Sequence, residues 1–287
     1  MTLAPFSDPV AEAYVIDLSE PRARDHLLTG GKAAALARAA QRGLQVPRGF
    51  VITRRFFDEV EQQSWKQGRD AVADDIELAL SSLGDGPVAV RSSAIAEDGA
   101  KASFAGQHET LLNVQGADEV LDAVAACWRS SRSTRTRDYR IHHGAKGEGF
   151  AVLIQEMVAA DACLVAFTID PVSGDRSHVV INAAWGLGES LVGGTTNVDV
   201  YRIRKLDFGI TTCQVVAKDR MTIPVPGGTR EVDVPEGSWR ERVLNEDQIR
   251  RVARLAIDLE NEADSPIDLE GAIAGDRLVL LQARPVT

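Results

Sequence analysis

The sequence of 287 residues contains no apolar run as long as a membrane span, and its N-terminus does not resemble a secretory signal. The opening segment MTLAPFSDPVAEAYVIDL lacks both the basic start and the long apolar stretch of a signal peptide. Cysteine is scarce, and the spacing of Cys127, Cys163 and Cys213 fits neither a zinc site nor a redox pair. These absences predict a reduced, cytoplasmic protein with no membrane partner.

Basic residues are in the minority, with 32 Lys and Arg against 42 Asp and Glu and a net charge of -10. A broadly acidic protein argues against nucleic acid as the main partner, although it still allows a local basic pocket for an anionic ligand. No tandem repeat or low-complexity linker divides the chain. The length and the 44% content of hydrophobic residues suffice for one large domain or two lobes.

The spacing of hydrophobic residues predicts both helices and strands. Helices are expected over residues 32–42, closed by Gly43, over 118–140, and after a capping box of Asn245 and Gln248. Strands of buried length are expected at 49–53, 87–93, 150–158, 163–170, 178–186 and, as a hairpin around 274–277, within 267–285. This mixture indicates an α+β or α/β protein.

The segment Gly30-Gly31-Lys32 precedes an alanine-rich helix and raises the question of whether it binds a nucleotide phosphate. A Walker A loop has the pattern G-x-x-x-x-G-K-[ST], but His26 and Ala33 occupy its outer positions here. A lysine in the first turn of a helix opposes the helix dipole, which suggests a functional role. Taken alone, the segment still favours an ordinary helix start.

A second candidate phosphate site lies within residues 88–114, where Arg91 ends an apolar strand and small residues follow. Gly, Ala and Ser allow backbone amides to close around phosphate groups. The alternative is a flexible surface loop, which composition alone favours because Glu97 and Asp98 would repel phosphate.

The third candidate site is the C-terminal segment 265–287, where four polar residues interrupt strands that otherwise look buried. Asp268 and Glu270 are two positions apart and share one face of a strand, as do Gln282 and Arg284. Two carboxylates and an amide oxygen suit Mg²⁺, which takes further oxygens from substrate phosphates. Arg284 is suited to hold a transferring phosphoryl group. The alternative is a solvated polar edge, which the cost of burying unpaired charge argues against.

A shared metal ion requires Glu270 and Gln282 to lie on one face, and this constrains the hairpin. A two-residue turn at Gly275-Asp276 would place Glu270 opposite Leu281 and turn Gln282 to the other face. We therefore predict an odd-length turn or a β-bulge between residues 273 and 279, with Glu270 opposite Gln282.

His178 follows Ser177 at the start of an apolar strand. A phosphate-accepting histidine is one interpretation of this pair. A histidine at the edge of a strand is the favoured one, because a turn precedes it directly.

Seven ordered segments resemble those of one family: GGKAAAL, VPRGFVIT, VRSSAIAED, SFAGQHETLLNV, FTIDPVSGD, AAWGLGESLVGG and DLEGAIAGDRLVLLQARPVT. They span residues 26 to 286 and are similar to the nucleotide-binding domain of pyruvate phosphate dikinase, phosphoenolpyruvate synthase and rifampin phosphotransferase. The resemblance implies one α+β domain of the ATP-grasp fold over residues 1–287. Its approximate lobes, 1–150 and 151–287, would enclose the nucleotide.

The resemblance also implies roles for individual residues. Lys32 and Arg91 would contact ATP phosphates, with Arg91 and Arg284 as the catalytic arginines. Magnesium would be held by Asp268, Glu270 and Gln282. The loop covering the phosphates would include Ser103, Gly106 and Gln107. Adenine would meet the backbone of a hinge formed by Gln155, Glu156, Met157 and Val158.

Two departures from the family bear on the shape of the pocket. Cys163-Leu164 stands where relatives usually carry Ser-Gly, and Gly271 stands where they often carry Trp. We expect these changes to alter the pocket while leaving catalysis in place.

The sequence contains neither the swivelling histidine domain nor the substrate barrel of the family's enzymes. The resemblance therefore implies an enzyme component that binds Mg-ATP and passes phosphoryl to a histidine on a separate domain or subunit, from which a final small-molecule acceptor receives it. ATP would give AMP and phosphate. The chain would be one subunit of a split enzyme, as in phenylphosphate synthase, or a fragment of a longer protein. The alternatives are a self-contained small-molecule kinase that transfers phosphoryl directly and a non-catalytic nucleotide-binding regulator.

Overall fold

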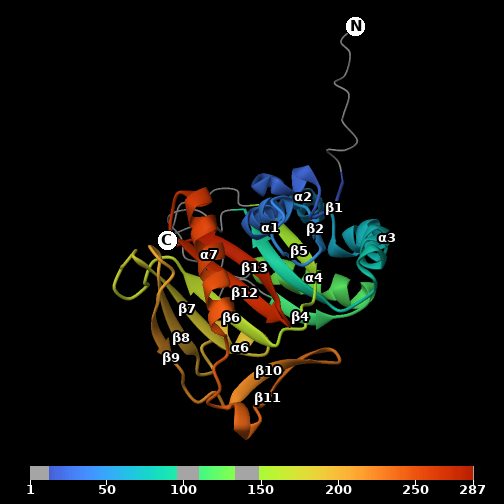
Figure 1. Ribbon diagram of the computed structural model, residues 1–287. Coiled ribbons are helices and arrows are strands. Elements are labelled where there is room, and N and C mark those ends of the chain that lie inside the picture. Colours follow the sequence, from blue (N-terminus) through green and yellow to red (C-terminus); the bar gives the residue numbers. More distant parts are fainter. Residues whose placement is uncertain (1–12, 96–109, 133–148, 287) are drawn as a thin grey trace. The chain divides into compact units, whose positions relative to one another are not determined.

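The computed structural model describes residues 13–95, 110–132 and 149–286 (Figure 1). The chain divides into two compact units, Met1–Ala37 with Arg48–Glu156 and Arg38–Pro47 with Met157–Thr287. This division differs from the expected lobes in two respects. Residues 38–47 belong to the second unit, and the first unit continues to Glu156 at the end of a strand.

The first unit is built on an antiparallel sheet in the order β1-β2-β5-β3-β4. Its strands are β1 (Val15–Asp17), β2 (Gly49–Ile52), β3 (Val88–Ala94), β4 (Thr110–Val114) and β5 (Phe150–Glu156). Its helices are the 3-10 turn η2 (Pro21–Arg24), α1 (His26–Gln41), whose last residues belong to the second unit, α2 (Arg54–Gln62), α3 (Trp65–Leu83) and α4 (Ala117–Ser131).

One face of this sheet packs against α2, α3 and α4. Phe50, Val90 and Ile154 of the strands form a single buried cluster with Val72 of α3 and Val124 of α4. Side chains alternate between the faces of a strand. The residues between these strand positions, which include the predicted site residues Arg91 and Gln155, therefore lie on the face turned away from the helical cluster.

Two glycines determine where α1 kinks and where it ends. Gly30 has φ 77° and ψ 168°, so the regular helix follows it, near the predicted start at Lys32. At the other end Gly43 has φ 81°, its amide donates to the Ala40 carbonyl and the Leu44 amide donates to the Ala39 carbonyl. This is a Schellman ending, and it confirms the predicted glycine cap.

The second unit contains a six-stranded antiparallel sheet in the order β13-β12-β6-β7-β8-β9. Its strands are β6 (Ala162–Phe167), β7 (His178–Trp185), β8 (Asp199–Arg204), β9 (Ile210–Gln214), β12 (Ile267–Ala274) and β13 (Arg277–Pro285). A separate hairpin consists of β10 (Arg220–Val225) and β11 (Gly228–Asp233), and the helices are α6 (Glu189–Val192), the 3-10 turn η3 (Glu236–Ser238) and α7 (Glu246–Ala263).

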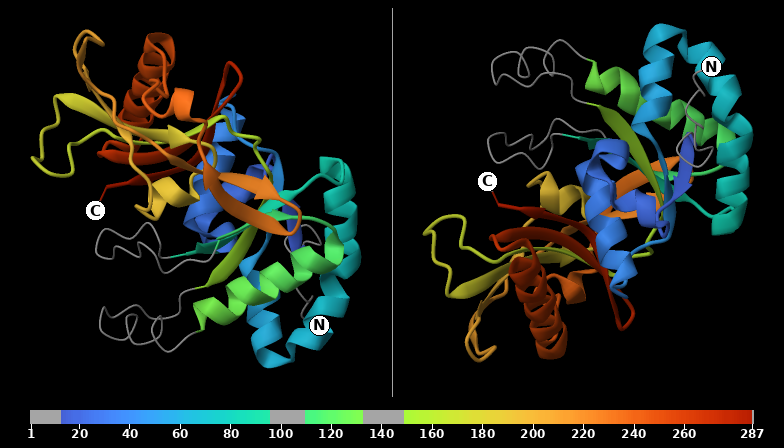
Figure 2. Two further views of the ribbon diagram at one scale, coloured as in Figure 1. Left: turned by 90° about the horizontal axis from the view of Figure 1, so that it is seen from below. Right: turned by 90° about the horizontal axis from the view of Figure 1, so that it is seen from above.

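Helix α7 covers one face of the six-stranded sheet (Figure 2). It begins with the predicted capping box, in which the Asn245 side chain accepts from the Gln248 amide and the Gln248 side chain accepts from the Asn245 amide. On the covered face, the cross-strand row Leu269, Ala166 and Ile181 is fully buried. The side chains on the other face alternate with this row, and many of them are only half-buried.

Every strand pair within these sheets is antiparallel, which confirms the α+β class. The predicted helix over 118–140 is present as α4 up to Ser131, and residues 133–140 lie outside the described part of the chain. No helix among the described residues combines the length and the apolar character needed to cross a membrane.

Candidate functional site

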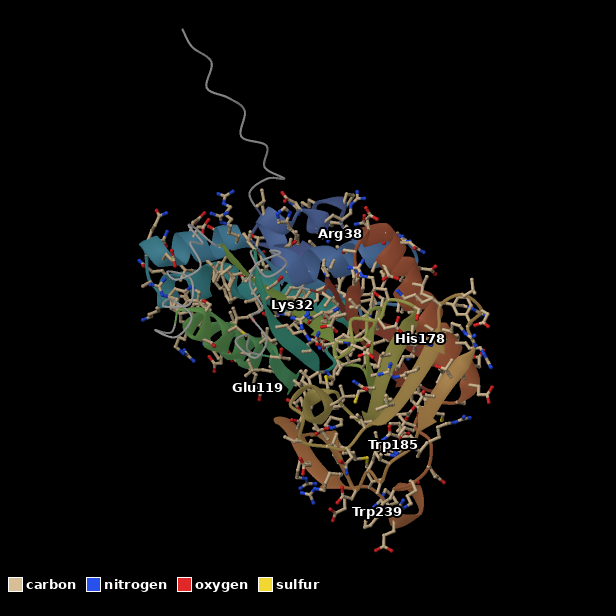
Figure 3. The ribbon with its side chains drawn as sticks, turned by 90° about the vertical axis from the view of Figure 1, so that its left-hand side faces the viewer. Lys32, Arg38, Glu119, His178, Trp185 and Trp239 are labelled. Carbon is tan, nitrogen blue, oxygen red and sulfur yellow. The ribbon has the colours of Figure 1, made fainter. Side chains whose placement is uncertain are left out.

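The Gly30-Gly31-Lys32 segment packs directly against the strand that carries the Val-Arg-Ser-Ser motif. A Cβ atom at Gly30 would collide with the carbonyl oxygen of Ser93, so glycine permits this close approach. The Ala33 amide donates to Ser93 Oγ over 3.3 Å, and Lys32 Nζ donates to the Ser92 carbonyl over 3.2 Å. Lys32 is only 9% exposed, and it is labelled in Figure 3. Two segments that the sequence singled out separately therefore form one structural element.

Arg91 lies in β3 on the same face as Ser93, because residues two apart on a strand share a face. It is half-buried and stands opposite Leu153 of β5 on one side and Thr110 of β4 on the other. In the first unit, Arg91 of β3 and Lys32, which is bonded to the next residue of that strand, therefore lie close together along β3. Two cations at this position suit an anionic ligand.

The predicted hinge residues divide into two groups. Gln155 is 2% exposed and pairs with both Gly49 and Ala89 in the sheet. Glu156 forms an ion pair with Arg48, and its amide donates to the Arg48 carbonyl.

Met157 and Val158 follow the end of β5, and their backbone groups bond to none of the residues that the structure describes. Of the four predicted hinge residues, these two are the ones whose backbone groups have no partner in the described part of the chain.

In the second unit, Glu270 stands directly opposite Gln282 and Asp268 directly opposite Arg284. The turn itself is the regular two-residue one, with Ala274 opposite Arg277. The register shifts between Glu270 and Gly271, where Leu281 is the extra residue of a β-bulge. The predicted pairing is confirmed, but the predicted position of the irregularity, between residues 273 and 279, is wrong.

Asp268 and Arg284 form an ion pair, with Arg284 Nε and Nη2 donating to Asp268 Oδ2 over 3.0 and 2.9 Å. Burial raises the pKa of the Asp268 carboxyl above its usual value, and the neighbouring guanidinium opposes the rise. The second oxygen, Oδ1, is buried without a hydrogen-bond partner among the described residues. The sequence indicated these two residues separately, and the structure joins them into one charged pair.

This donor set fits a hard divalent cation that also binds phosphates. A buried carboxylate oxygen without a partner, a half-buried carboxylate at Glu270 and the 8% exposed amide of Gln282 occupy adjacent strands. No three His, Cys, Asp or Glu side chains of the described segments gather into a metal-binding group. Mg²⁺ held here would therefore take its remaining ligands from water or phosphate oxygens, which is its usual mode.

The two departures from the family are cross-strand neighbours, a relationship that the sequence did not reveal. Leu164 of β6 stands opposite Gly271 of β12, and its Cδ1 would lie 3.2 Å from a Cβ at Gly271. Both residues lie on the face covered by α7, one position away from the face of Glu270. Leu164 thus occupies the space beside Gly271, on the face turned away from Glu270.

Cys163 lies on the same face as Val165 and is 2% exposed. Burial raises the pKa of its thiol to about 12. The thiol therefore stays protonated at neutral pH and is no nucleophile.

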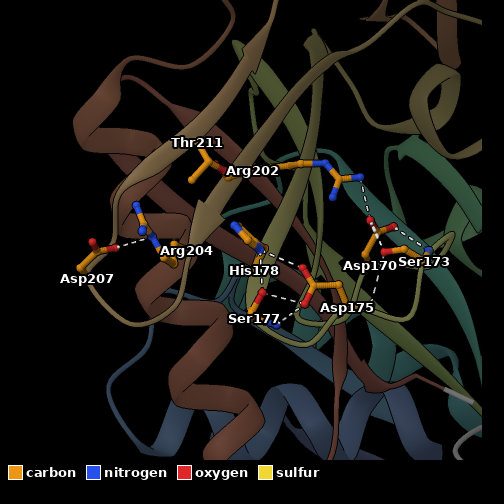
Figure 4. Close-up of polar contacts among 9 residues, drawn as sticks. All are labelled: Asp170, Ser173, Asp175, Ser177, His178, Arg202, Arg204, Asp207 and Thr211. Atoms are coloured by element: carbon orange, nitrogen blue, oxygen red, sulfur yellow. Dashed lines mark hydrogen bonds and ion pairs between the residues drawn. The ribbon is translucent and has the colours of Figure 1, made fainter.

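His178 belongs to a local network at the turn before β7 (Figure 4). Its Nδ1 lies 2.8 Å from Asp175 Oδ2 and 2.8 Å from Ser177 Oγ. Hydrogen bonds from Ser177, together with the histidine, lower the pKa of Asp175 to about 2. This network gives the histidine a structural role at the strand edge.

The loop residues Ser103, Gly106 and Gln107, predicted to cover the phosphates, lie outside the described residues. The described phosphate-binding candidates are thus Lys32 and Arg91 in one unit and Arg284 in the other.

The sequence from residue 66 to residue 287 matches the family model of the pyruvate phosphate dikinase AMP/ATP-binding domain. The chain belongs to this family. Membership confirms the resemblance drawn from the seven motifs and, with it, the ATP-grasp fold of the α+β class.

Three relatives are identical to this chain at about a third of the aligned positions. It is 35% identical to the prodigiosin synthesizing transferase PigC of Serratia marcescens, over 95% of this chain and 33% of the relative. It is 32% identical to a probable phosphoenolpyruvate synthase of Methanocaldococcus jannaschii, over 96% of this chain and 27% of the relative. A rifampicin phosphotransferase of a Streptomyces species is 34% identical to it, over 95% of this chain and 36% of the relative. The chain therefore spans about a third of the length of these relatives.

Proposed function

We propose that this chain binds Mg-ATP and prepares it for phosphoryl transfer. The observation that carries the proposal is the pairing of Asp268 and Glu270 with Arg284 and Gln282 on adjacent strands, which gathers two carboxylates, an amide and a guanidinium. Membership in a family of AMP/ATP-binding domains supports the choice of nucleotide. Catalysis of phosphoryl transfer depends mainly on positioning and on neutralising charge, and these groups supply both.

Each group has a distinct task in this proposal. Glu270, Gln282 and the partnerless oxygen of Asp268 hold Mg²⁺, which, when bound, neutralises phosphate charge. Arg284 binds the transferring phosphoryl group, and the ion pair with Asp268 fixes the direction of its guanidinium. Lys32 and Arg91 bind phosphate oxygens, and the backbone of Met157 and Val158 binds the edge of adenine.

We further propose that the phosphoryl group passes to a histidine on a separate domain or subunit. Overall, ATP, water and a final small-molecule acceptor would give AMP, phosphate and the phosphorylated acceptor. The relatives named above are much longer than this chain, which leaves room in them for such a domain. His178 is not the acceptor in this proposal, because it begins β7 of this same chain, whereas the proposed acceptor histidine lies on a separate domain or subunit.

Calorimetry of the chain with ATP tests the first part. Binding in the presence of Mg²⁺ that weakens strongly in EDTA is expected, and equal binding in both would contradict the metal site. Incubation with labelled ATP tests the second part. The chain alone is expected to release little AMP, and a histidine-bearing partner is expected to restore it. Release of ADP with a small acceptor and no partner would instead indicate a self-contained kinase, and rapid labelling of His178 would contradict the assignment of its role.

A further inference from the structure

Asn182 is a polar side chain in the middle of an otherwise apolar strand. Its neighbours in β7, from Val179 to Ala184, are buried hydrophobic residues, whereas Asn182 is half-buried. The side-chain amide of Asn182 makes no hydrogen bond to any residue that the structure describes. A half-buried side-chain amide without a protein partner among the described residues keeps its donor and acceptor available to a ligand.

The sheet register places Asn182 on the face that carries the proposed metal site. Glu270 stands opposite Val165, Val165 opposite Asn182, and Asn182 opposite Val200. Directly opposed residues of antiparallel strands share a face. With strands spaced about 4.8 Å apart, Asn182 lies about 10 Å from Glu270 along one row of the sheet.

The chemistry of this row favours a sugar hydroxyl over a phosphate. Phosphates are bound best by charged donors, and the row of Glu270, Val165, Asn182 and Val200 contains none. A neutral amide both donates and accepts, which matches a hydroxyl group that does the same. Val165 and Val200 on either side of Asn182 offer an apolar floor to the carbon atoms of a sugar.

We infer that Asn182 hydrogen-bonds a ribose hydroxyl of the bound nucleotide. The inference rests on the proposed binding of Mg-ATP to Glu270 and Gln282. A nucleotide whose terminal phosphates lie at Glu270 carries its ribose at the far end of the triphosphate. The triphosphate is long enough to span the separation between Glu270 and Asn182. Asn182 is a binding residue that would select ribonucleotides over deoxyribonucleotides.

The test is calorimetry of the full chain in Mg²⁺ with ATP, 2′-deoxy-ATP and 3′-deoxy-ATP. Wild type is expected to bind at least one deoxy analogue about fivefold more weakly, the loss of one hydrogen bond. Asn182→Leu, which keeps the branching and the number of non-hydrogen atoms of the side chain, is expected to bind ATP about fivefold more weakly and to lose the discrimination. Gln214→Leu is the matched control, because this exposed amide lies two strands further along the same row and should bind as wild type does.

Equal binding of all three nucleotides by wild type would overturn the inference even if Asn182→Leu does not fold. Retained discrimination in Asn182→Leu would overturn it as well. Both outcomes leave Mg-ATP binding, and thus the proposed function, intact. Absence of Mg-ATP binding to wild type would instead contradict the proposed function, and the inference with it.

Discussion

Glu270 and Gln282 stand directly opposite each other, although the hairpin reverses in a two-residue turn whose register would place Glu270 opposite Leu281. The β-bulge at Leu281 removes the discrepancy. Bulges re-aim side chains next to functional sites, and this one returns both proposed metal ligands to a shared face.

If Glu270 and Gln282 hold one metal ion, their effects on binding will not add. Glu270→Gln and Gln282→Leu are each expected to weaken Mg-ATP binding roughly tenfold or more, because even the outer-shell partners of metal ligands contribute that much. The double variant should lose less binding free energy than the two single variants together, by a coupling free energy of about 1–2 kcal/mol. Calorimetry in Mg²⁺ measures this, and binding in EDTA is the control that should not distinguish the variants. Strict additivity in Mg²⁺ would contradict a shared ion.

Lys32→Ala and Arg91→Ala should each weaken ATP binding about tenfold or more, because each removes a charged hydrogen bond to phosphate. Lys66→Ala on α3 removes the same charge from an exposed position and should bind as wild type does. Unchanged affinity in both site variants would move the phosphates elsewhere.

Gly30→Ala is expected to destabilise the fold more than Gly43→Ala. Both glycines have positive φ angles, of 77° and 81°, so both substitutions carry a backbone penalty of at least about 1–2 kcal/mol, and the ψ of 168° places Gly30 in a region that only glycine adopts readily. Only at Gly30 would the new Cβ also collide with the Ser93 carbonyl, while at Gly43 it meets nothing within 4 Å. Urea unfolding measures both variants. Equal losses would show that contact between α1 and β3 does not require glycine.

Removal of Arg284 should destabilise the protein most at neutral pH. Burial raises the pKa of Asp268 in the folded state above its unfolded value. Between these two values the folded state keeps a proton that the unfolded state releases, so stability is lost as the pH rises through the folded pKa. Arg284 opposes this rise, and Arg284→Ala is expected to cost about 1–3 kcal/mol at pH 7 and clearly less near pH 4. Asp268→Asn with Arg284→Ala should lose the pH dependence. A cost independent of pH in the single variant would show that the ion pair is not its cause.

Gly271→Trp should be strongly destabilising alone and partly rescued by Leu164→Gly. The Gly271 position has no room beside Leu164 Cδ1 and the Val279 carbonyl, each 3.2 Å from a Cβ placed there. Overpacking of this kind costs about 1–3 kcal/mol. Leu164→Gly alone, which opens a cavity, is the second arm of the double-mutant cycle. Additive losses would contradict the compensation between these residues.

Features that depend on near neighbours could be predicted from the sequence. Asn245 and Gln248 identified a capping box, Gly43 identified a helix end, and the spacing of Asp268 and Glu270 placed both on one face. Each of these follows from local backbone geometry, because caps and strand faces involve residues only a few positions apart. The need for either an odd-length turn or a bulge also followed, because it depends only on counting residues along the hairpin.

Only the tertiary structure decided at which residue the hairpin forms its bulge and which side chains contact one another. The bulge lies at Leu281 and not in the turn, Arg284 pairs with Asp268, and Leu164 stands opposite Gly271. These relationships join residues far apart in the chain, and many registers satisfy the same local preferences. Packing of one sheet face against α7 selects among them, because a one-residue slip would expose Leu269 and bury Glu270.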